Sequence, residues 1–397
     1  MKKFVDVSKH VKWVGVVDQD IKTFHGEELE LSNGTSYNSY LIRDEKIVLV
    51  DTVIQKYSRE WLQELKEEID LDTIDYIVMN HNEPDHSGAL KDLMKEIPNT
   101  PIYCTAKGKE IIQAYHNIDA EFRIVKTGDT LELGETNLTF VEMKMLHWPD
   151  SMASYLSQDN ILFSNDAFGQ HYGANALFND ECDQEILWDE SLKYYACILT
   201  PFSAMIKRKI DEILSFNLTI DQICTSHGVI WRKNPLEIVT KYMEWCQDYK
   251  EDQVTIVYDT MWETTRKMAE SMADGIRSKS PSTHIMLMNA CKYSETEILT
   301  EIFKSKGVLF GSPTINNRIL PSMAAVLEGV KGINFKGKSV GSFGSYGWNC
   351  RSVGIINDLL NTTALTVVND GLKVNWNLNK DSKEICFEYG ADFVEQI

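Results

Sequence analysis

No two of the eight cysteines form a C-x-x-C pair, so the sequence carries no rubredoxin-type or zinc-ribbon module. The N-terminus has no long apolar stretch, and no run approaches 18 apolar residues, so we expect neither a signal peptide nor a transmembrane helix. The cysteines are therefore expected to be free thiols in a reducing cytoplasm, mostly as core residues.

Positive charge is also scarce. The sequence holds 40 Lys and Arg against 59 Asp and Glu, a formal net charge of −19. Binding to a phosphate backbone requires basic patches, so this balance argues against nucleic acid as a partner. With 397 residues, 25% of them charged and 43% hydrophobic, the chain has the composition of an ordinary globular protein with two domains or one large one.

A sextet of potential metal ligands follows an apolar run. Residues 74–79, which only Asp75 interrupts, predict a buried strand. The next residues, His81-Asn82-Glu83-Pro84-Asp85-His86, offer two imidazoles and two carboxylates, all of which bind first-row metals. Pro84 and Gly88 predict a tight, non-helical path. We interpret the sextet as a metal site at the C-terminal end of a strand.

Three further candidate ligands also follow predicted strands. His147 comes after a strand over 137–145, Asp166 after one over 160–164, and His227 after one over 220–225. Taken singly, each histidine is better explained as a core or surface residue. Loops at one edge of a sheet can converge in space, however, so four strand-end candidates favour one shared site.

A change of composition near residues 248–253 predicts a boundary between a domain over 1–250 and another over 251–397. Predicted strands then alternate with helices, the strands at 254–258, 284–288, 307–310 and 339–343. Regular alternation of this kind predicts a doubly wound parallel sheet.

Three loops of the second domain suit a flavin mononucleotide. In a doubly wound sheet, ligands bind beyond the carboxyl ends of the strands. Hydroxyl groups at a helix N-terminus suit a phosphate dianion, and the absence of G-x-x-x-x-G-K-[ST] argues against a nucleoside triphosphate. Aromatic side chains in the loops suit a planar ring. We therefore expect the cofactor to be bound by Thr260, Met261, Trp262, Thr264, Thr265, Ser312, Pro313, Thr314, Asn316, Asn317, Ser345, Tyr346, Gly347 and Trp348.

With these motifs, the whole chain resembles the flavodiiron proteins, also called A-type flavoproteins. The resemblance implies an α/β chain, with a metallo-β-lactamase-like αββα sandwich followed by a flavodoxin-like doubly wound parallel sheet. It implies that one iron is bound by His81, Glu83 and His147, another by Asp85, His86 and His227, and that Asp166 bridges the two. Zinc hydrolases of the same fold usually show H-x-H-x-D-H, and a carboxylate at Glu83 suits iron better than zinc.

The resemblance also implies an activity, the reduction of O2 to water or of NO to N2O and water, with FMN and two iron ions as cofactors. His25 and a tyrosine of the pair Tyr194-Tyr195, here taken as Tyr195, resemble residues that line the substrate side in the family. His171 is a further candidate. Ordinary polar packing explains His25 and the tyrosine equally well.

The remaining expectations concern partners. Because the sequence ends at Ile397 with no fused electron-transfer module, electrons are expected from a separate rubredoxin, a flavin reductase or a reduced deazaflavin. The family resemblance implies a head-to-tail homodimer or a dimer of dimers, and the missing secretory signal predicts a cytoplasmic protein. Asn349-Cys350-Arg351 departs from the usual third flavin loop and places a thiol near the ring.

Two alternative functions stay open. One is a zinc-dependent hydrolase with an accessory flavin domain, and the other is a flavodoxin-like electron carrier whose N-terminal domain is structural. The sequence does not distinguish O2 from NO, because both substrates use the same ligands.

Overall fold

The computed structural model describes residues 4–397, and the chain divides into two compact units. The first contains the chain up to Lys22, Leu31–Tyr194 and Phe202–Met243. The second contains Thr23–Glu30, Tyr195–Pro201 and Glu244–Ile397. The main division thus falls shortly before residue 250, and two short segments from the N-terminal part of the sequence belong to the second unit. Of the helices between residues 4 and 397, none combines the length and apolar character that a bilayer span needs.

Two sheets form the first unit, with strand orders β1-β2-β7-β8-β9-β10-β11 and β12-β13-β14-β15-β16. The larger sheet comprises Val5–Asp6, Val11–Trp13, Tyr40–Arg43, Ile47–Val50, Tyr76–Val78, Ile102–Cys104 and Phe122–Ile124. The smaller comprises Thr130–Glu132, Asn137–Glu142, Met152–Leu156, Ile161–Asn165 and Gln222–Thr225. A separate antiparallel pair joins β3 (Val16–Asp18) to β6 (Thr35–Tyr37).

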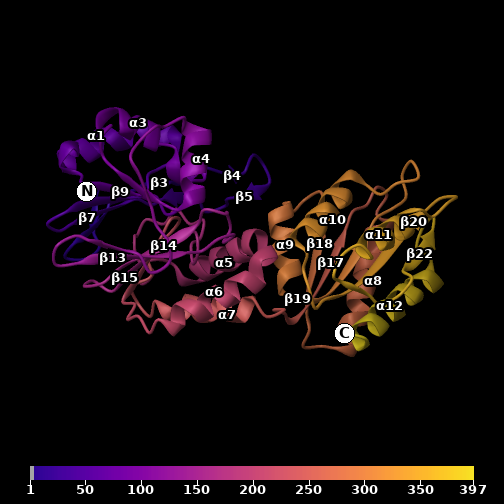
Figure 1. Cartoon of the computed structure of the whole chain (residues 1–397). Coiled ribbons are helices and arrows are strands. Elements are labelled where there is room, and N and C mark those ends of the chain that lie inside the picture. The colour runs from indigo at the N-terminus through magenta and orange to yellow at the C-terminus, as the bar shows by residue number, and fades with distance from the viewer. Residues whose placement is uncertain (1–3) are drawn as a thin grey trace. The chain divides into compact units, whose positions relative to one another are not determined.

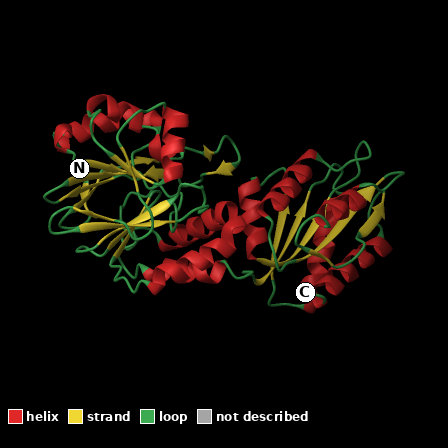
Figure 2. Ribbon diagram, in the orientation of Figure 1, coloured by secondary structure: helices red, strands yellow, loops and turns green. Residues whose placement is uncertain are grey.

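Helices lie outside these sheets (Figures 1 and 2). On the side of the larger sheet they are α1 (Ser58–Glu68), α3 (Leu90–Glu96) and α4 (Ala106–His116). Between β15 and β16 of the smaller sheet come α5 (Gln184–Tyr194) and α6 (Ser203–Ser215), and α7 (Leu236–Trp245) follows β16. In α1 the buried residues Trp61, Leu62 and Leu65 recur at helical spacing, which turns one face of the helix towards the core.

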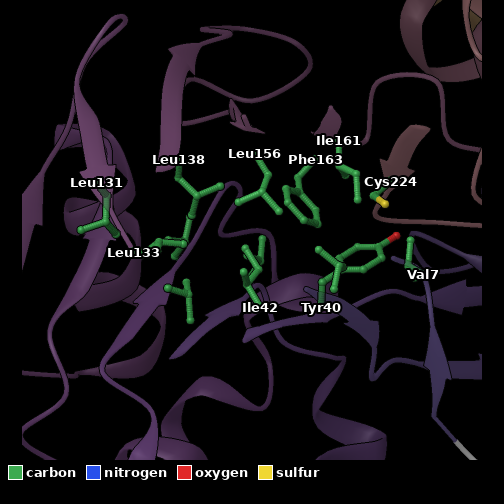
Figure 3. Packing of buried hydrophobic residues seen from close by; sticks show 14 of the residues in the cluster. Val7, Tyr40, Ile42, Leu131, Leu133, Leu138, Leu156, Ile161, Phe163 and Cys224 are labelled. Atoms are coloured by element: carbon green, nitrogen blue, oxygen red, sulfur yellow. The ribbon is translucent and has the colours of Figure 1, made fainter. Parts of the chain in front are cut away.

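Apolar side chains fill the space between the two sheets. Tyr40 and Ile42 of β7 face Leu138, Leu156 and Phe163 of the smaller sheet (Figure 3). The rings of Tyr40 and Phe163 lie 5.2 Å apart, and all five side chains are buried. Removing such surface from water stabilises the fold by about 25 cal/mol per Å². The core therefore lies between the sheets, which confirms the predicted αββα sandwich.

A parallel sheet forms the centre of the second unit. Its order is β18-β17-β19-β20, and both β21 and β22 pair with β20. The strands are Glu251–Tyr258 (β17), His284–Asn289 (β18), Ser305–Gly311 (β19), Ser339–Tyr346 (β20), Thr366–Val367 (β21) and Leu372–Asn375 (β22). The strand order reverses between β17 and β19, and the crevice there is the switch point at which doubly wound sheets bind ligands.

Five helices cover this sheet, and they confirm the predicted doubly wound fold. α8 (Thr264–Lys279) packs along α12 (Lys380–Glu395), as Figure 1 also shows. The others are α9 (Glu295–Lys304), α10 (Pro321–Ile333) and α11 (Ser352–Leu360). Local signals fix several helix starts: Ser294 and Glu297 form a capping box for α9, and Pro321 opens α10.

A hairpin from the N-terminal part of the sequence belongs to the second unit. Its strands are β4 (Thr23–Phe24) and β5 (Leu29–Glu30). The backbone N–H of Glu30 donates to Oγ1 of Thr296 on α9 at 2.9 Å, and the Thr296 hydroxyl donates to the Glu28 carbonyl at 3.3 Å. The segment Tyr195–Pro201 likewise joins this unit, and nothing in the sequence pattern predicts either assignment.

Candidate metal centre and cofactor pocket

The sextet lies just beyond the end of β9. Oδ1 of Asp51 accepts the backbone N–H of Asn80 at 2.7 Å and so fixes the chain where it leaves the strand. Pro84–Ser87 then forms one helical turn, α2, so the predicted non-helical path is wrong here. Proline suits the first position of a helix, because its φ is already helical and its missing N–H would have no partner there. The His86 carbonyl, in this turn, accepts hydrogen bonds from the backbone and the hydroxyl of Thr52.

Seven side chains gather into two adjacent groups. In each group the candidate ligand atoms lie within 4.8 Å of one another, and the groups are His81, Glu83, His147 and Asp166, and then Asp85, His86 and His227. Oε2 of Glu83 lies 3.3 Å from His81 Nε2 and 3.4 Å from His147 Nε2. Oδ2 of Asp85 lies 3.3 Å from His86 Nε2 and 3.0 Å from His227 Nε2. The structure thus brings together all seven predicted ligands.

Asp166 lies between the two groups, and its two oxygens face different ones. Oδ2 is 3.4 Å from His81 Nε2 and 3.2 Å from His147 Nε2. Oδ1 is 3.0 Å from His86 Nε2 and 3.8 Å from His227 Nε2. Within residues 4–397, neither oxygen of Asp166 and neither ring nitrogen of His86 makes a hydrogen bond, although all four atoms are buried. Buried polar atoms in this state indicate a missing partner, and here a pair of cations fits.

The charges of the site also indicate a place for cations. Burial raises the pKa of Asp166, but His86, His147 and His81 outweigh it and hold that pKa well below the usual range. Burial lowers the pKa of His86, but Asp85 and Asp166 outweigh it and raise that pKa to about 9. In the protein without metal, protons on the histidines therefore balance the carboxylates. Bound cations would replace those protons.

Outer hydrogen bonds orient two of the histidines. His81 Nδ1 lies 3.2 Å from Oδ1 of Asp150, whose Oδ2 accepts from the backbone N–H and the side-chain amide of Asn82 at 2.8 and 2.9 Å. His227 Nδ1 lies 2.7 Å from the carbonyl oxygen of Ser36. Each contact favours a proton on Nδ1 and leaves Nε2 as the metal-binding atom. Four imidazoles, three carboxylates and no thiolate form a donor set that suits first-row ions such as iron.

The predicted lining residues divide between the two units. His171 lies beside the metal centre, with Nδ1 2.9 Å from Thr35 Oγ1 and its ring 4.7 Å from that of His227. The Tyr194 ring lies 5.1 Å from His171 and 6.4 Å from His227. Tyr195 instead belongs to the second unit.

The backbone explains why adjacent tyrosines diverge. The α-helix α5 ends at Tyr194, and a π-helical segment begins at Tyr195. The Tyr195 ring therefore packs near Trp245 and Phe303, at 5.5 and 5.8 Å. The structure favours Tyr194 over the predicted Tyr195 as the tyrosine beside the metal centre. His25 also belongs to the second unit, where its ring lies 4.6 Å from that of Phe24.

A cavity of about 470 Å³ opens at the carboxyl ends of β17, β19 and β20. All the predicted cofactor residues line it except Thr260, Thr265 and Ser312, and it is also lined by Ile315, Asn349 and Trp376. Two of the exceptions support the wall: Thr265 Oγ1 lies 3.0 Å from Ser345 Oγ, and Ser312 Oγ accepts the Leu320 N–H at 3.0 Å. Cys350, expected near the ring, is not among the lining residues.

The cavity fits an FMN at both ends. Where β17 leads into α8, the hydroxyl oxygen of Thr260 is buried and, within residues 4–397, has no hydrogen-bond partner. A phosphate at this helix N-terminus would supply one. Trp262, Trp348 and Trp376, which also line the cavity, are 86%, 90% and 65% exposed, as expected of walls for a planar ring. Trp376 could not be predicted from the sequence, because the short strand before it, β22, gives no clear signal there.

Comparisons with known proteins agree with both halves of the chain as described. Residues 35–228 match the family model described as "ODP family beta lactamase", and residues 256–390 match the one described as "Flavodoxin".

Similar sequences and structures extend over nearly the whole chain. The anaerobic nitric oxide reductase flavorubredoxin of Aliivibrio fischeri is 49% identical over 395 residues, which are 99% of this chain and 79% of the relative. Its counterpart in Escherichia coli O1:K1 is 49% identical over 98% of this chain and 82% of the relative. The flavodiiron protein of Giardia intestinalis has a TM-score of 0.94 at 35% identity, covering 99% of this chain and 96% of that one. The rubredoxin oxygen:oxidoreductase of Desulfovibrio gigas has a TM-score of 0.95 at 33% identity, covering 99% and 98%.

Proposed function

Because the chain belongs to the flavodiiron protein family, we propose that it is an oxidoreductase that reduces NO to N2O and O2 to water at the metal centre of its first unit. The observation that carries the proposal is Asp166, whose two oxygens face two separate ligand groups. When bound, the two iron ions and the FMN supply the redox chemistry and the electrons. The protein's own contribution is to position ligands, to exclude bulk water and to deliver protons.

Glu83 supports iron over zinc. A zinc hydrolase of this fold would place a nitrogen donor at this position, whereas Glu83 adds a hard oxygen and a negative charge. Its Oε2 lies 3.3 and 3.4 Å from the Nε2 atoms of His81 and His147, so it belongs to the ligand group rather than to the wall of the pocket. Purified protein with two zinc ions and no iron would favour the hydrolase instead.

Tyr194 and His171 are the polar residues that we assign to the wall beside His227. Burial, and then the charge of Asp166, raise the pKa of the Tyr194 phenol well above its usual value. The phenol therefore stays protonated and can donate a hydrogen bond towards the centre. His171 is held in place by its contact with Thr35. Both would orient a small polar substrate, and Tyr194 would do so as the neutral phenol.

The FMN in the second unit must be supplied with electrons. The relatives' names include a flavorubredoxin and a rubredoxin oxygen:oxidoreductase, so we propose a rubredoxin-type protein as the donor. A flavin reductase or a reduced deazaflavin are the alternatives to test beside it. We further propose a cytoplasmic protein that assembles as a head-to-tail homodimer or a dimer of dimers, with the flavin loops of one copy facing the metal centre of another. Sedimentation of an active monomer would contradict the assembly.

The decisive experiment mixes the reduced protein with O2 and, separately, with NO in an anaerobic stopped-flow instrument, with iron and FMN quantified in the same sample. We expect both gases to reoxidise the flavin. The variant Asp166→Ala should keep its FMN and lose this reaction, because the shared carboxylate is gone. Gas reduction that persists in the variant would instead support an electron carrier with a structural N-terminal unit. No reaction of the parent protein with either gas would refute the proposal.

A further inference from the structure

Both proposed reactions consume protons: O2 takes up four to give two waters, and two NO take up two to give N2O and one water. The metal centre is buried, and its carboxylates and imidazoles are occupied as ligands. Protons therefore need a route from solvent that reaches the edge of the ligand groups. The need for such a route rests on the proposed function.

A cavity of about 570 Å³ lies in the first unit next to the chain segments that hold His227. Ser36 and Gly228 line it, and the Ser36 carbonyl oxygen lies 2.7 Å from His227 Nδ1. Asp18 and Tyr57 also line it. Gly228, in the wall of this cavity, is thus the next residue in the chain after His227, a candidate metal ligand.

The Asp18 carboxylate gives this cavity a proton-exchanging surface. Lys56 Nζ donates to Asp18 Oδ2 at 2.9 Å. Burial raises the pKa of Asp18, but hydrogen bonds from Lys56 and Tyr57 outweigh it and lower that pKa. Asp18 is therefore ionised at the cavity and can hold ordered water there, and that water can carry protons from solvent.

Tyr37 lies between this cavity and the metal centre. It is on β6 and is fully buried. Its ring is 6.2 Å from that of Tyr57 on one side and 5.9 Å from that of His227 on the other. Within residues 4–397, neither the Tyr37 hydroxyl nor Oδ1 of Asp85 has a hydrogen-bond partner, and both atoms are buried. A buried hydroxyl without a partner destabilises the fold, which indicates a partner that the described residues do not supply.

We propose that the Tyr37 hydroxyl relays protons from the Asp18–Tyr57 cavity to the metal centre, through an ordered water that links it to Asp85 Oδ1. In each passage the hydroxyl gives its proton to this water, which passes one of its own protons on towards the centre, and the hydroxyl then takes a new proton from a water of the cavity. The tyrosine is neither oxidised nor left charged. A water suits the gap because it can donate to the carboxylate oxygen and accept from the phenol, which satisfies both buried atoms.

The electrostatics of Tyr37 agree with a relay that never rests as an anion. Burial raises the pKa of the phenol, and the charges of Asp85 and Asp18 raise it further. That these two carboxylates both act on the hydroxyl supports its position between the centre and the cavity. The phenol thus holds its proton until another replaces it.

The test is Tyr37→Phe, which keeps the ring and removes only the hydroxyl. We expect unchanged iron and FMN content, turnover that is slower by roughly 10-fold or more, and a larger solvent deuterium isotope effect, because proton delivery becomes limiting. The matched control is Tyr155→Phe on β14. The Tyr155 hydroxyl donates to the Thr219 carbonyl at 2.7 Å, and neither residue belongs to the metal centre or to the cavity. The control should lower stability slightly and leave both kinetic quantities unchanged.

A second readout does not depend on turnover. A high-resolution crystal structure of the iron-loaded protein should show an ordered water within hydrogen-bond distance of both the Tyr37 hydroxyl and Asp85 Oδ1. A dry gap, or a Tyr37→Phe protein with the parent rate and isotope effect, would overturn the relay. If Tyr37→Phe kept the parent rate and isotope effect, the proton route would instead pass His171 and Tyr194. A parent protein inactive with both gases would instead refute the proposed function, independently of the water.

Discussion

Asp150 offers the sharpest test of how the metal centre is held. It contacts no candidate metal position itself, yet its Oδ1 lies 3.2 Å from His81 Nδ1 and its Oδ2 accepts two hydrogen bonds from Asn82. The change Asp150→Asn keeps the shape and removes this pattern of acceptors. If the amide oxygen faces His81, the NH2 group meets the two donors of Asn82. If the amide is turned, the NH2 group faces His81 Nδ1 and favours the tautomer that blocks Nε2.

Either orientation loses at least one hydrogen bond to a charged acceptor, which is worth about 1.5–3 kcal/mol. That range corresponds to roughly 10- to 100-fold in a binding constant, in line with the usual effect of removing a partner of a metal-binding histidine. We therefore expect the iron affinity of the group around His81 to fall by this factor, and that of the group around His86 to fall less. Titration of the metal-free protein with Fe(II) against a competing chelator measures both.

The chain provides a matched control for this experiment. Asp159 is another aspartate paired with a histidine, its Oδ1 lying 2.6 Å from His10 Nδ1, but it lies outside both metal-ligand groups. Asp159→Asn should lower stability and leave iron binding unchanged. Equal affinities in the Asp150→Asn and parent proteins, or an equal loss in both variants, would refute the idea that Asp150 orients His81.

Proton release, acid stability and cofactor affinity provide three more tests. Iron binding at pH 7 should release protons, because the pKa of His86 is raised to about 9 in the metal-free protein. Calorimetry in buffers of different ionisation enthalpy counts the released protons, and a count of zero would contradict the charge balance. Burial raises the pKa of Asp44, but hydrogen bonds from backbone N–H groups outweigh it and lower that pKa to about 2. The stabilisation by Asp44 is therefore present above its unfolded pKa near 4 and disappears towards pH 2. In urea unfolding, Asp44→Asn should lower the free energy of unfolding by about 1–2 kcal/mol at pH 7 and by almost nothing at pH 2. Trp376→Ala should weaken FMN binding roughly 10-fold in a fluorescence titration, and Trp376→Phe less, since part of the aromatic wall is kept; equal affinities would remove Trp376 from the site.

The candidate metal ligands could be predicted from the sequence because they lie in or near a clear local signal. Asp166 and His227 follow strands whose apolar runs are plain in the sequence, and parallel strand ends meet at one edge of a sheet. The choice between Tyr194 and Tyr195 could not be made in this way. It depends on a change from α- to π-helical backbone between the two, which leaves no mark in residue types.

The second unit shows the same limit. Apolar stretches in β17, β18 and β19 predict these strands, and the regular alternation with helices also predicts β20, whose sequence is rich in serine and glycine. β22 has one buried residue, Val374, and so lacks both the apolar run and the clear alternation that would identify a strand. α12 was missed because only a few of its residues are apolar and buried, among them Cys386 and Phe393. Trp376 comes directly after β22, and without that strand its place in the cofactor pocket could not be inferred.

The hairpin at Thr23–Glu30 and the segment Tyr195–Pro201 bear on how this chain could be taken apart. The chain passes between the units after residues 22, 30, 194, 201 and 243. A single protease cut after residue 243 would thus leave both units attached through the remaining crossings. A gene fragment that begins at residue 244 would encode the cofactor-binding sheet without the strand whose Glu30 bonds to Thr296. Exchange of this half between relatives by recombination would therefore need matching changes at two distant places in the gene.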